Sequence, residues 1–426
     1  MPHLDGPTSR RISEHSPIWP ATGAPHPYAH VCKANMAQAA NRDGFDQTAA
    51  LLLQSSRAIT LEQQERAMAE PDATAATDIT EAARRRNSQL IERNREPLIE
   101  LEPRYLVQMA HLTTPATVWK YVEGAATRSQ ANLVMLDLED SIPRDNPKLL
   151  EQGRANIIRA FNELDWGRRL RFFRPRGVEL DPAHEDIALI VEQAGANLDG
   201  LIYPKIEDAD EVRSIDATLT ALEQRYGLPA GRIRIEALIE SARAEENVFE
   251  IAFASKRLVG LVLGTYDYWA SLGLRGSSYR YDHPLIDQVR GRIVKAAAAA
   301  GIPAIAEMTT NYPTRDKSET ERRAALEEFR RDALYARDFG FAGKWTGIPE
   351  QTAMAVEIFQ IPDDEISRAI EEARRFLEAE AEGRGAVMIE GRMADRATDR
   401  VNRNTLKMAY ALARIDEVMA RELRLI

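Results

Sequence analysis

Three carboxylates follow one short apolar run. The segment VMLDLEDSIP occupies residues 134–143, and Asp137, Glu139 and Asp140 come at the end of its apolar stretch. Carboxylates gathered in a concave site repel one another unless a cation lies among them. A hard divalent cation binds carboxylate oxygens, and Mg²⁺ usually takes one or two carboxylates and completes its coordination with water and substrate oxygens. The segment therefore raises the question of which cation, and which other acids, it meets in the fold.

Charged residues also follow other apolar, β-prone runs. They are Arg174, Arg176, Lys205, Glu207, Glu240, Asp267, Glu307 and Lys344. In a β/α barrel the carboxyl ends of the strands converge on one rim, and that rim carries the chemistry. Glu240 and Asp267 are one β/α repeat apart, so we expect them on adjacent strands as part of an oxygen-ligated metal site. The other acids are expected to act through metal-bound water, and no pair of histidines has a spacing that suggests zinc.

Two cationic residues each have two interpretations. Arg174 either forms a salt bridge with one of the acids or binds a substrate oxyanion, for which its planar fork suits a carboxylate or an enolate oxygen. Lys205 is either a Schiff-base lysine or one half of a structural ion pair. With so many acids nearby, we favour the ion pair for Lys205.

From residue 100 onward, short apolar runs alternate with amphipathic stretches. The predicted strands are 104–109, 132–138, 170–175, 200–206, 233–240, 258–264, 302–308 and 341–348, and the predicted helices include 148–163, 208–226, 285–300 and 319–338. This alternation indicates a parallel sheet covered on both faces, and eight strands over about 250 residues suit a closed (β/α)₈ TIM barrel. A doubly wound open sheet is the alternative, but no GxGxxG or GxxxxGK[ST] motif follows a strand.

The segments on either side of the predicted barrel have a different character. Residues 1–99 are interpreted as an N-terminal extension, partly disordered and partly helical, and residues 100–350 as the catalytic TIM-barrel domain. Residues 351–426 are interpreted as a C-terminal helical segment that acts as a lid or an oligomer contact. Within it we predict a helix over 362–382, a glycine-interrupted link over 383–395 that resembles a small hairpin, and a long final helix over 397–423.

Composition disfavours several kinds of partner and location. The formal net charge of −10 disfavours nucleic acids and anionic membranes. No apolar run approaches the roughly 20 residues that a membrane span needs, and the N-terminus lacks the apolar region of a secretory signal. The single cysteine, Cys32, cannot form an internal disulfide and fits a reducing compartment. We therefore expect a cytoplasmic protein.

Several motifs, in order and at barrel spacing, resemble one known family. They are LDLED (136–140), YPKIED (203–208), ALIESARAEENVFEIA (237–252), LVLGTYDYWASLGL (261–274), GFAGKWTGIPEQ (340–351) and GRMAD (391–395). Residues 100–410 thus resemble the HpcH/HpaI aldolase and citrate lyase superfamily, on its CitE-like, malyl-CoA lyase branch. LDLED favours this CoA-ester branch over the aldolases that act on free 2-oxo acids. The family's IHPxQ motif reads GIPEQ at 347–351, without the histidine.

The resemblance implies roles for six residues. Glu240 and Asp267 resemble the family's metal ligands, and Arg174 resembles the arginine that stabilises the thioester enolate. Glu139 and Asp140 resemble the acidic pair that holds metal-bound water. Asp395 resembles the acid/base that a neighbouring subunit supplies in malyl-CoA lyases.

The resemblance also implies an activity. We expect a Mg²⁺-dependent lyase, with Mn²⁺ as a substitute, that cleaves a malyl-, methylmalyl- or citramalyl-CoA-like substrate into an acyl-CoA and a 2-oxo acid. A homo-oligomer, trimeric or hexameric, is expected. The alternatives are a metal-dependent aldolase on a free 2-oxo acid, a malyl-CoA thioesterase, and a non-catalytic, lyase-like subunit.

Overall fold

The computed structural model describes residues 81–89 and 101–426. The chain divides into two compact units, Met1–Leu90 and Ile91–Ile426. In the first unit, residues 81–89 form a helix, as predicted within the N-terminal extension. The rest of that extension, including Cys32, lies outside the described residues.

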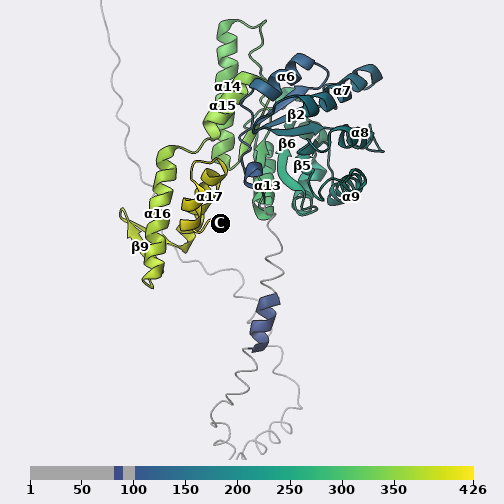
Figure 1. Cartoon of the computed structure of the whole chain (residues 1–426). Helices are drawn as coiled ribbons and strands as arrows, with labels where there is room; N and C mark the ends of the chain where they lie inside the picture. The colour runs from purple at the N-terminus through teal and green to yellow at the C-terminus, as the bar shows by residue number, and fades with distance from the viewer. Residues whose placement is uncertain (1–80, 90–100) are drawn as a thin grey trace, which may run out of the picture. The chain divides into compact units, whose positions relative to one another are not determined.

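The second unit contains a closed barrel of eight parallel strands in sequential order (Figure 1). The strands are β1 (Ala110–Pro115), β2 (Leu133–Asp137), β3 (Leu170–Arg174), β4 (Gly200–Tyr203), β5 (Arg234–Ile239), β6 (Leu258–Leu263), β7 (Ala304–Ala306) and β8 (Gly343–Thr346). Strand β1 pairs with both β2 and β8, which closes the barrel. The predicted (β/α)₈ TIM barrel is confirmed, and the open-sheet alternative is wrong.

Helices follow the strands around the outside of the barrel. They are α6 (Trp119–Arg128), α7 (Pro147–Glu163), α8 (Glu185–Ala194), α9 (Ala209–Tyr226), α10 (Ala242–Glu246), α11 (Val248–Ala252), α12 (Thr265–Ser271), α13 (Pro284–Ala300), α14 (Glu319–Phe339) and α15 (Pro349–Phe359), with a short 3₁₀ turn at Gly276–Ser278. Local signals set their ends. Asp208 caps the first turn of α9, and Gly227 ends that helix with a φ of 68°. Ser318 and Glu321 form a capping box at the start of α14.

The strands are buried on both faces, and alternate residues face different parts of the core. Along β2, Leu133 and Met135 belong to the cluster inside the barrel, whereas Val134 and Leu136 belong to the cluster between strands and helices. Because side chains alternate along a strand, every second residue points into the barrel. The same alternation directs the residues at the strand ends, where the site lies.

The predicted first strand, 104–109, is wrong. Residues Pro103–Leu106 form the short helix α5, and β1 begins only at Ala110. Pro103 lies in the first turn of α5, where its restricted φ favours a helix. Tyr105 of α5 belongs to the interior cluster with Leu133 and Leu170, which begin β2 and β3. The apolar run thus closes the amino-terminal end of the barrel.

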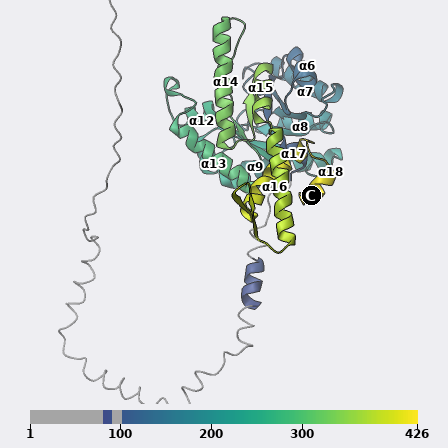
Figure 2. The ribbon, with the colours of Figure 1, turned by 90° about the vertical axis from the view of Figure 1, so that its left-hand side faces the viewer.

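The C-terminal segment consists of α16 (Asp363–Ala381), a hairpin of β9 (Ala386–Ile389) and β10 (Arg392–Asp395), α17 (Arg396–Ala411) and α18 (Glu417–Glu422). Helices α16 and α17 lie side by side (Figure 2). The predicted helix over 362–382 and the hairpin are confirmed. The single final helix over 397–423 is wrong, because Ala413 adopts a φ of 56° and Asp416 caps a new helix.

In the part of the chain that the structure describes, no helix combines the length and apolarity needed to cross a membrane.

Candidate active site at the carboxyl rim of the barrel

The carboxyl ends of the strands surround two cavities that share Glu240 and Asp267. We call the first the aromatic lobe. It measures about 440 Å³ and is lined by Thr113, Pro115, Asp140, Ser141, Arg174, Gly264, Thr265, Tyr266, Met308, Thr310, Tyr312, Trp345 and Gly347, besides the shared acids. We call the second the polar lobe. It measures about 360 Å³, and its lining includes Glu139, Arg144, Lys205, Glu207, Glu211 and Ser241, besides the shared acids.

Strand alternation explains why three of the charged residues gather at this rim. Leu133 and Met135 point into the barrel, so Asp137 on the same strand does as well. By the same rule Arg174 follows the inward Phe172, and Glu240 follows the inward Leu238. The side chains of Asp137, Arg174 and Glu240 are all buried.

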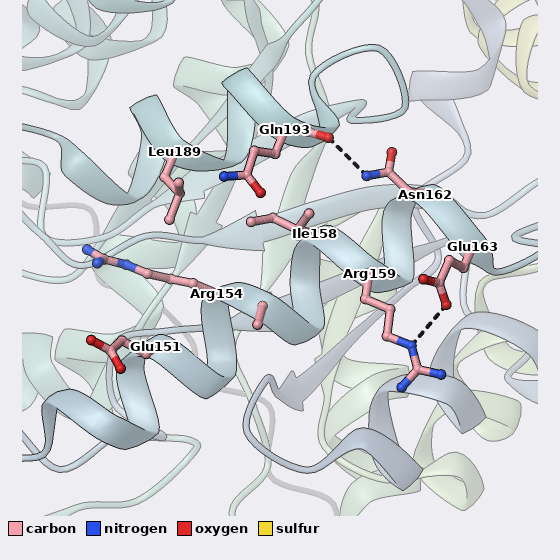
Figure 3. Close-up of a pocket in the computed structure, with 9 residues that line it drawn as sticks. Glu151, Arg154, Ile158, Arg159, Asn162, Glu163, Leu189 and Gln193 are labelled. Atoms are coloured by element: carbon pink, nitrogen blue, oxygen red, sulfur yellow. Dashed lines mark hydrogen bonds and ion pairs between the residues drawn. The ribbon is translucent and has the colours of Figure 1, made fainter.

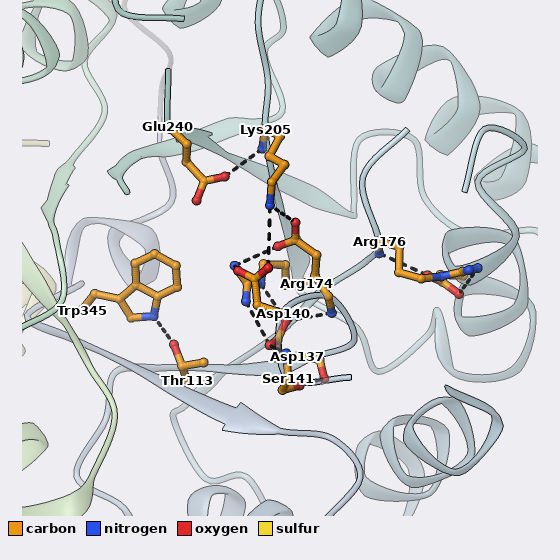
Figure 4. Close-up of polar contacts among 11 residues, drawn as sticks. Thr113, Asp137, Asp140, Ser141, Arg174, Arg176, Lys205, Glu240 and Trp345 are labelled. Atoms are coloured by element: carbon orange, nitrogen blue, oxygen red, sulfur yellow. Dashed lines mark hydrogen bonds and ion pairs between the residues drawn. The ribbon is translucent and has the colours of Figure 1, made fainter. Parts of the chain in front are cut away.

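Asp137 and Arg174 form a two-pronged ion pair (Figure 4). Arg174 Nε and Nη2 donate to the two carboxylate oxygens at 2.6 and 2.9 Å. The backbone N–H groups of Glu139 and Ser141 donate to the same carboxylate, each at 3.0 Å. Burial alone would raise the pKa of Asp137, but Arg174 and these hydrogen bonds hold it below its ordinary value. Asp137 therefore stays charged and fixes the plane of the guanidinium.

Glu139 and Asp140 complete the surroundings of Arg174. Arg174 Nη1 lies 2.9 Å from Glu139 and 3.2 Å from Asp140. Glu139 is buried, whereas the side chain of Asp140 is 57% exposed. Burial raises the pKa of Glu139, and Arg174 and Lys205 only partly offset this effect. The Lys205 ammonium pairs with Glu139, so the predicted ion pair is confirmed.

Glu240 and Asp267 come from neighbouring strands, as expected. Glu240 directly follows β5, and Asp267 lies in the first turn of α12 after the adjacent β6. Glu240 Oε2 accepts a hydrogen bond from the Lys205 backbone N–H at 3.0 Å. A Cβ at Gly264 would lie 2.6 Å from Glu240 Oε1, so only glycine leaves room for this carboxylate. Burial raises the pKa of Glu240 to about 8, and the charge of Glu139 adds to the effect.

The donors at the mouth fit Mg²⁺. Among residues 81–89 and 101–426, no group of three or more His, Cys, Asp or Glu side chains is arranged to hold a metal. Mg²⁺ does not need such a cage, because it usually takes one or two carboxylates together with water and substrate oxygens. Glu240 and Asp267 face the same cavities, and a cation there would stabilise the buried Glu240 carboxylate in its charged form. These two residues could therefore hold the ion.

Asp395 is not brought to this mouth within one chain. It lies at the end of β10 and lines neither lobe. Its side chain caps α17 by accepting hydrogen bonds from the N–H groups of Ala397 and Thr398 at 2.9 and 3.0 Å. These bonds lower the pKa of Asp395.

Two charges expected at the rim lie behind it instead. Lys344 points away from the barrel interior, and its ammonium donates to the Glu307 carbonyl at 2.6 Å. The Glu307 carboxylate accepts from Arg290 Nε at 3.0 Å. Trp345, the neighbour of Lys344, takes the inward position and lies 5.7 Å from the Arg174 guanidinium, measured to the ring centroid. Because side chains alternate along β8, an inward Trp345 requires an outward Lys344, and the sequence could have shown this.

A further cavity of about 440 Å³ lies on the outside of the barrel between α7 and α8 (Figure 3). Several of its polar side chains are paired with their neighbours. Arg159 donates to Glu163 at 2.9 Å, and the Asn162 amide donates to the Gln193 carbonyl at 2.9 Å. Arg154 is held by Asp186. This surface lacks the convergent acids and cations of the rim.

Comparison with known proteins agrees with the geometry. The family described as HpcH/HpaI aldolase/citrate lyase matches residues 117–345. The L-malyl-CoA/beta-methylmalyl-CoA lyase of Cereibacter sphaeroides is 32% identical over 306 residues, which cover 68% of this chain and 89% of that protein. The citrate lyase subunit beta of Leuconostoc mesenteroides is 29% identical over 289 residues, which cover 67% of this chain and 88% of that protein.

Solved structures share the fold. A citrate lyase from Burkholderia xenovorans superposes with a TM-score of 0.58 at 22% identity, covering 78% of this chain and 98% of that one. The malate synthase of Haloferax volcanii gives a TM-score of 0.52 at 20% identity, covering 65% of this chain and 86% of that one. With its closed barrel and its matching sequence, the chain belongs to the HpcH/HpaI aldolase/citrate lyase family.

Proposed function

We propose that the protein is a Mg²⁺-dependent carbon–carbon lyase that cleaves a malyl-, methylmalyl- or citramalyl-CoA-like 3-hydroxyacyl-CoA into an acyl-CoA and a 2-oxo acid. One observation carries the proposal. A rigidly held guanidinium, Arg174, faces the same cavity as a pair of carboxylates, Glu240 and Asp267. This combination suits a reaction in which negative charge moves from a hydroxyl oxygen to a thioester oxygen. The names of the curated relatives support the choice of a CoA ester.

In this proposal Glu240 and Asp267 hold the metal, and Glu139 and Asp140 hold its water. When bound, Mg²⁺ supplies a Lewis acid for the carboxylate and hydroxyl oxygens of the substrate, and Mn²⁺ is expected to substitute for it. The Lys205 amide donates a hydrogen bond to Glu240, and the absence of a Cβ at Gly264 leaves room for the Glu240 carboxylate. The chain thus orients the carboxylate before any ligand arrives.

Replacing Gly264 with alanine should weaken Mg²⁺ binding about 10-fold or more, because the new Cβ must displace Glu240. Isothermal titration of Mg²⁺ measures the effect. Gly385→Ala is the matched control, since a Cβ there meets nothing within 4 Å. Wild-type affinity in Gly264→Ala would contradict a ligand role for Glu240.

The remaining chemistry falls to Arg174 and Asp395. Cleavage breaks the bond between the hydroxyl-bearing carbon and the α-carbon of the thioester. The hydroxyl proton passes to solvent water and the hydroxyl-bearing carbon becomes the carbonyl of the oxo acid, while the bonding electron pair forms the thioester enolate. Arg174 stabilises the enolate oxygen, and Asp395 delivers a proton to the α-carbon. The acyl-CoA then leaves.

We assign Asp395 to the mouth of a neighbouring copy in a homo-oligomer. Asp395 lines neither lobe of its own barrel. The hairpin that carries it exposes two large apolar side chains, Met388 and Met393, at 62% and 64%. These residues are opposite each other in the hairpin register, so they form one exposed apolar patch. Such a patch suits packing against a partner. A trimer or hexamer is the expected assembly.

Mixing two inactive variants should restore activity if Asp395 acts across the interface. An Asp395→Asn chain keeps Arg174, and an Arg174→Gln chain keeps Asp395. After dissociation and random reassembly, about a quarter of the mouths combine both intact residues. Recovery of roughly that share of wild-type turnover is expected. No recovery in mixed oligomers, verified by differential tags, would show that each chain uses its own Asp395.

Incubation with Mg²⁺ and a panel of 3-hydroxyacyl-CoA esters tests the whole proposal. Release of an acyl-CoA together with a 2-oxo acid is the expected result. Free CoA with an intact hydroxy acid would indicate a thioesterase. Cleavage of a CoA-free substrate would indicate an aldolase on free 2-oxo acids, and no turnover with any ester would favour a non-catalytic subunit.

A further inference from the structure

Lys205 has a backbone geometry that the proposed reaction leaves unexplained. Its φ is 52°, in the left-handed region that residues with a Cβ rarely adopt. In this conformation its N–H donates to Glu240 Oε2 at 3.0 Å, and its ammonium reaches back to Glu139. Figure 4 shows Lys205 between Glu240 and Asp140. Backbone strain of this kind persists only where the surrounding structure holds it.

The charges at the mouth explain what Lys205 contributes. Glu139, Asp140 and Glu240 lie close together, and Asp267 shares the cavities with them. Arg174 gives two of its nitrogens to Asp137, and only Nη1 faces Glu139 and Asp140, at 2.9 and 3.2 Å. Lys205 pairs with Glu139 and lies 3.7 Å from Asp140, so its charge compensates the acids that face the cavity. These are the acids that the proposed function assigns to the metal and its water.

We propose that Lys205 is a positioning residue that serves as the resident counter-cation of the metal site. Its amide holds Glu240, and its ammonium holds Glu139 and Asp140 together before a metal binds. The same ammonium opposes the arriving divalent cation, since like charges repel across a short distance. Lys205 therefore lowers the affinity of the site for Mg²⁺ but keeps the acids ordered when no metal is bound. This inference rests on the metal site of the proposed function.

Two neutral variants, Lys205→Met and Lys205→Gln, remove the charge of the ammonium but keep the backbone amide that donates to Glu240. Both side chains are unbranched at Cβ, so the left-handed backbone is no more strained than with lysine. Glutamine also keeps a hydrogen-bond donor near the acids and guards against loss of folding. Isothermal titration should show Mg²⁺ binding about 3- to 10-fold tighter than wild type, because one opposing charge is gone.

Thermal unfolding gives a second readout. In EDTA, Lys205→Met should melt about 2–4 °C below wild type, because the acids lose their counter-cation. At saturating Mg²⁺ this deficit should shrink by at least half. Lys205→Arg should match wild type in both measurements. Lys256→Met, an exposed lysine just before β6 and so at the opposite end of the barrel, should also match.

The outcomes distinguish this inference from the proposed function. Unchanged or weaker Mg²⁺ binding in both neutral variants would overturn the counter-cation role alone. An equal melting deficit with and without Mg²⁺ would also overturn it, since that is the result of a merely structural ion pair. A wild-type protein that binds no Mg²⁺ would overturn the proposed metal site and this inference together, whereas lyase turnover is judged separately by its products.

Discussion

Replacing Arg174 with lysine is expected to lower kcat about 100- to 1000-fold while leaving Mg²⁺ affinity close to wild type. Arg174 is 4% exposed and contacts Asp137 through two N–H groups at 2.6 and 2.9 Å. Lysine keeps the positive charge, so Asp137 does not become a buried, uncompensated carboxylate. It loses the planar fork that contacts Asp137 and a substrate oxygen at the same time. The loss should fall on kcat because the enolate forms only during the reaction.

Steady-state kinetics and Mg²⁺ titration measure these effects on the same preparation. Arg176→Lys is the matched control, because Arg176 lies two residues further along and pairs with Asp186 at 2.9 Å instead. It lines neither lobe and should leave kcat within a few-fold of wild type. Wild-type kcat with a raised KM in the Arg174→Lys enzyme would mean that Arg174 only binds substrate.

Replacing Asp395 with asparagine is expected to lower kcat about 100- to 10,000-fold, the usual range for a lost general acid or base. Asparagine caps a helix as well as aspartate does, so α17 should keep the cap that accepts from Ala397 and Thr398. The substitution therefore removes the transferable proton with little change in structure. Mg²⁺ affinity and melting temperature should stay near wild type, because the proposed ligands are Glu240 and Asp267 and because asparagine keeps the helix cap.

Asp416→Asn provides the corresponding control. Asp416 caps α18 by accepting from the Met419 N–H at 2.8 Å, so the same chemical change occurs at a cap with no assigned role in catalysis. Its turnover should equal that of wild type. If Asp395→Asn turns over at the wild-type rate, another group must protonate the enolate carbon.

Much of the fold could be predicted from local pattern. Repeated apolar runs separated by amphipathic stretches require a covered parallel sheet, and eight repeats suit closure into a barrel. The prediction of the first strand failed because two neighbouring segments competed for the same place in the barrel. The run at 104–109 is the more apolar, yet Ala110–Pro115 forms β1 while Tyr105 closes the bottom of the barrel. Which of the two segments becomes the first strand depends on how the barrel closes, and the sequence of one segment does not show this.

The order of apolar runs and charged residues was enough to predict which charges follow which strands, and therefore that Glu139, Arg174, Glu240 and Asp267 belong to one rim. The sequence did not single out Asp137 among the acids that follow this strand, although Asp137 is the residue that holds Arg174. The contacts among these residues became visible only in the folded chain: Asp137 pairs with Arg174, the Lys205 amide donates to Glu240, and Lys344 lies behind the rim. The pattern along one strand shows only which side chains share a face of that strand. Which of them meet across the barrel depends on the register between strands and on a backbone angle at Lys205 that lysine seldom adopts.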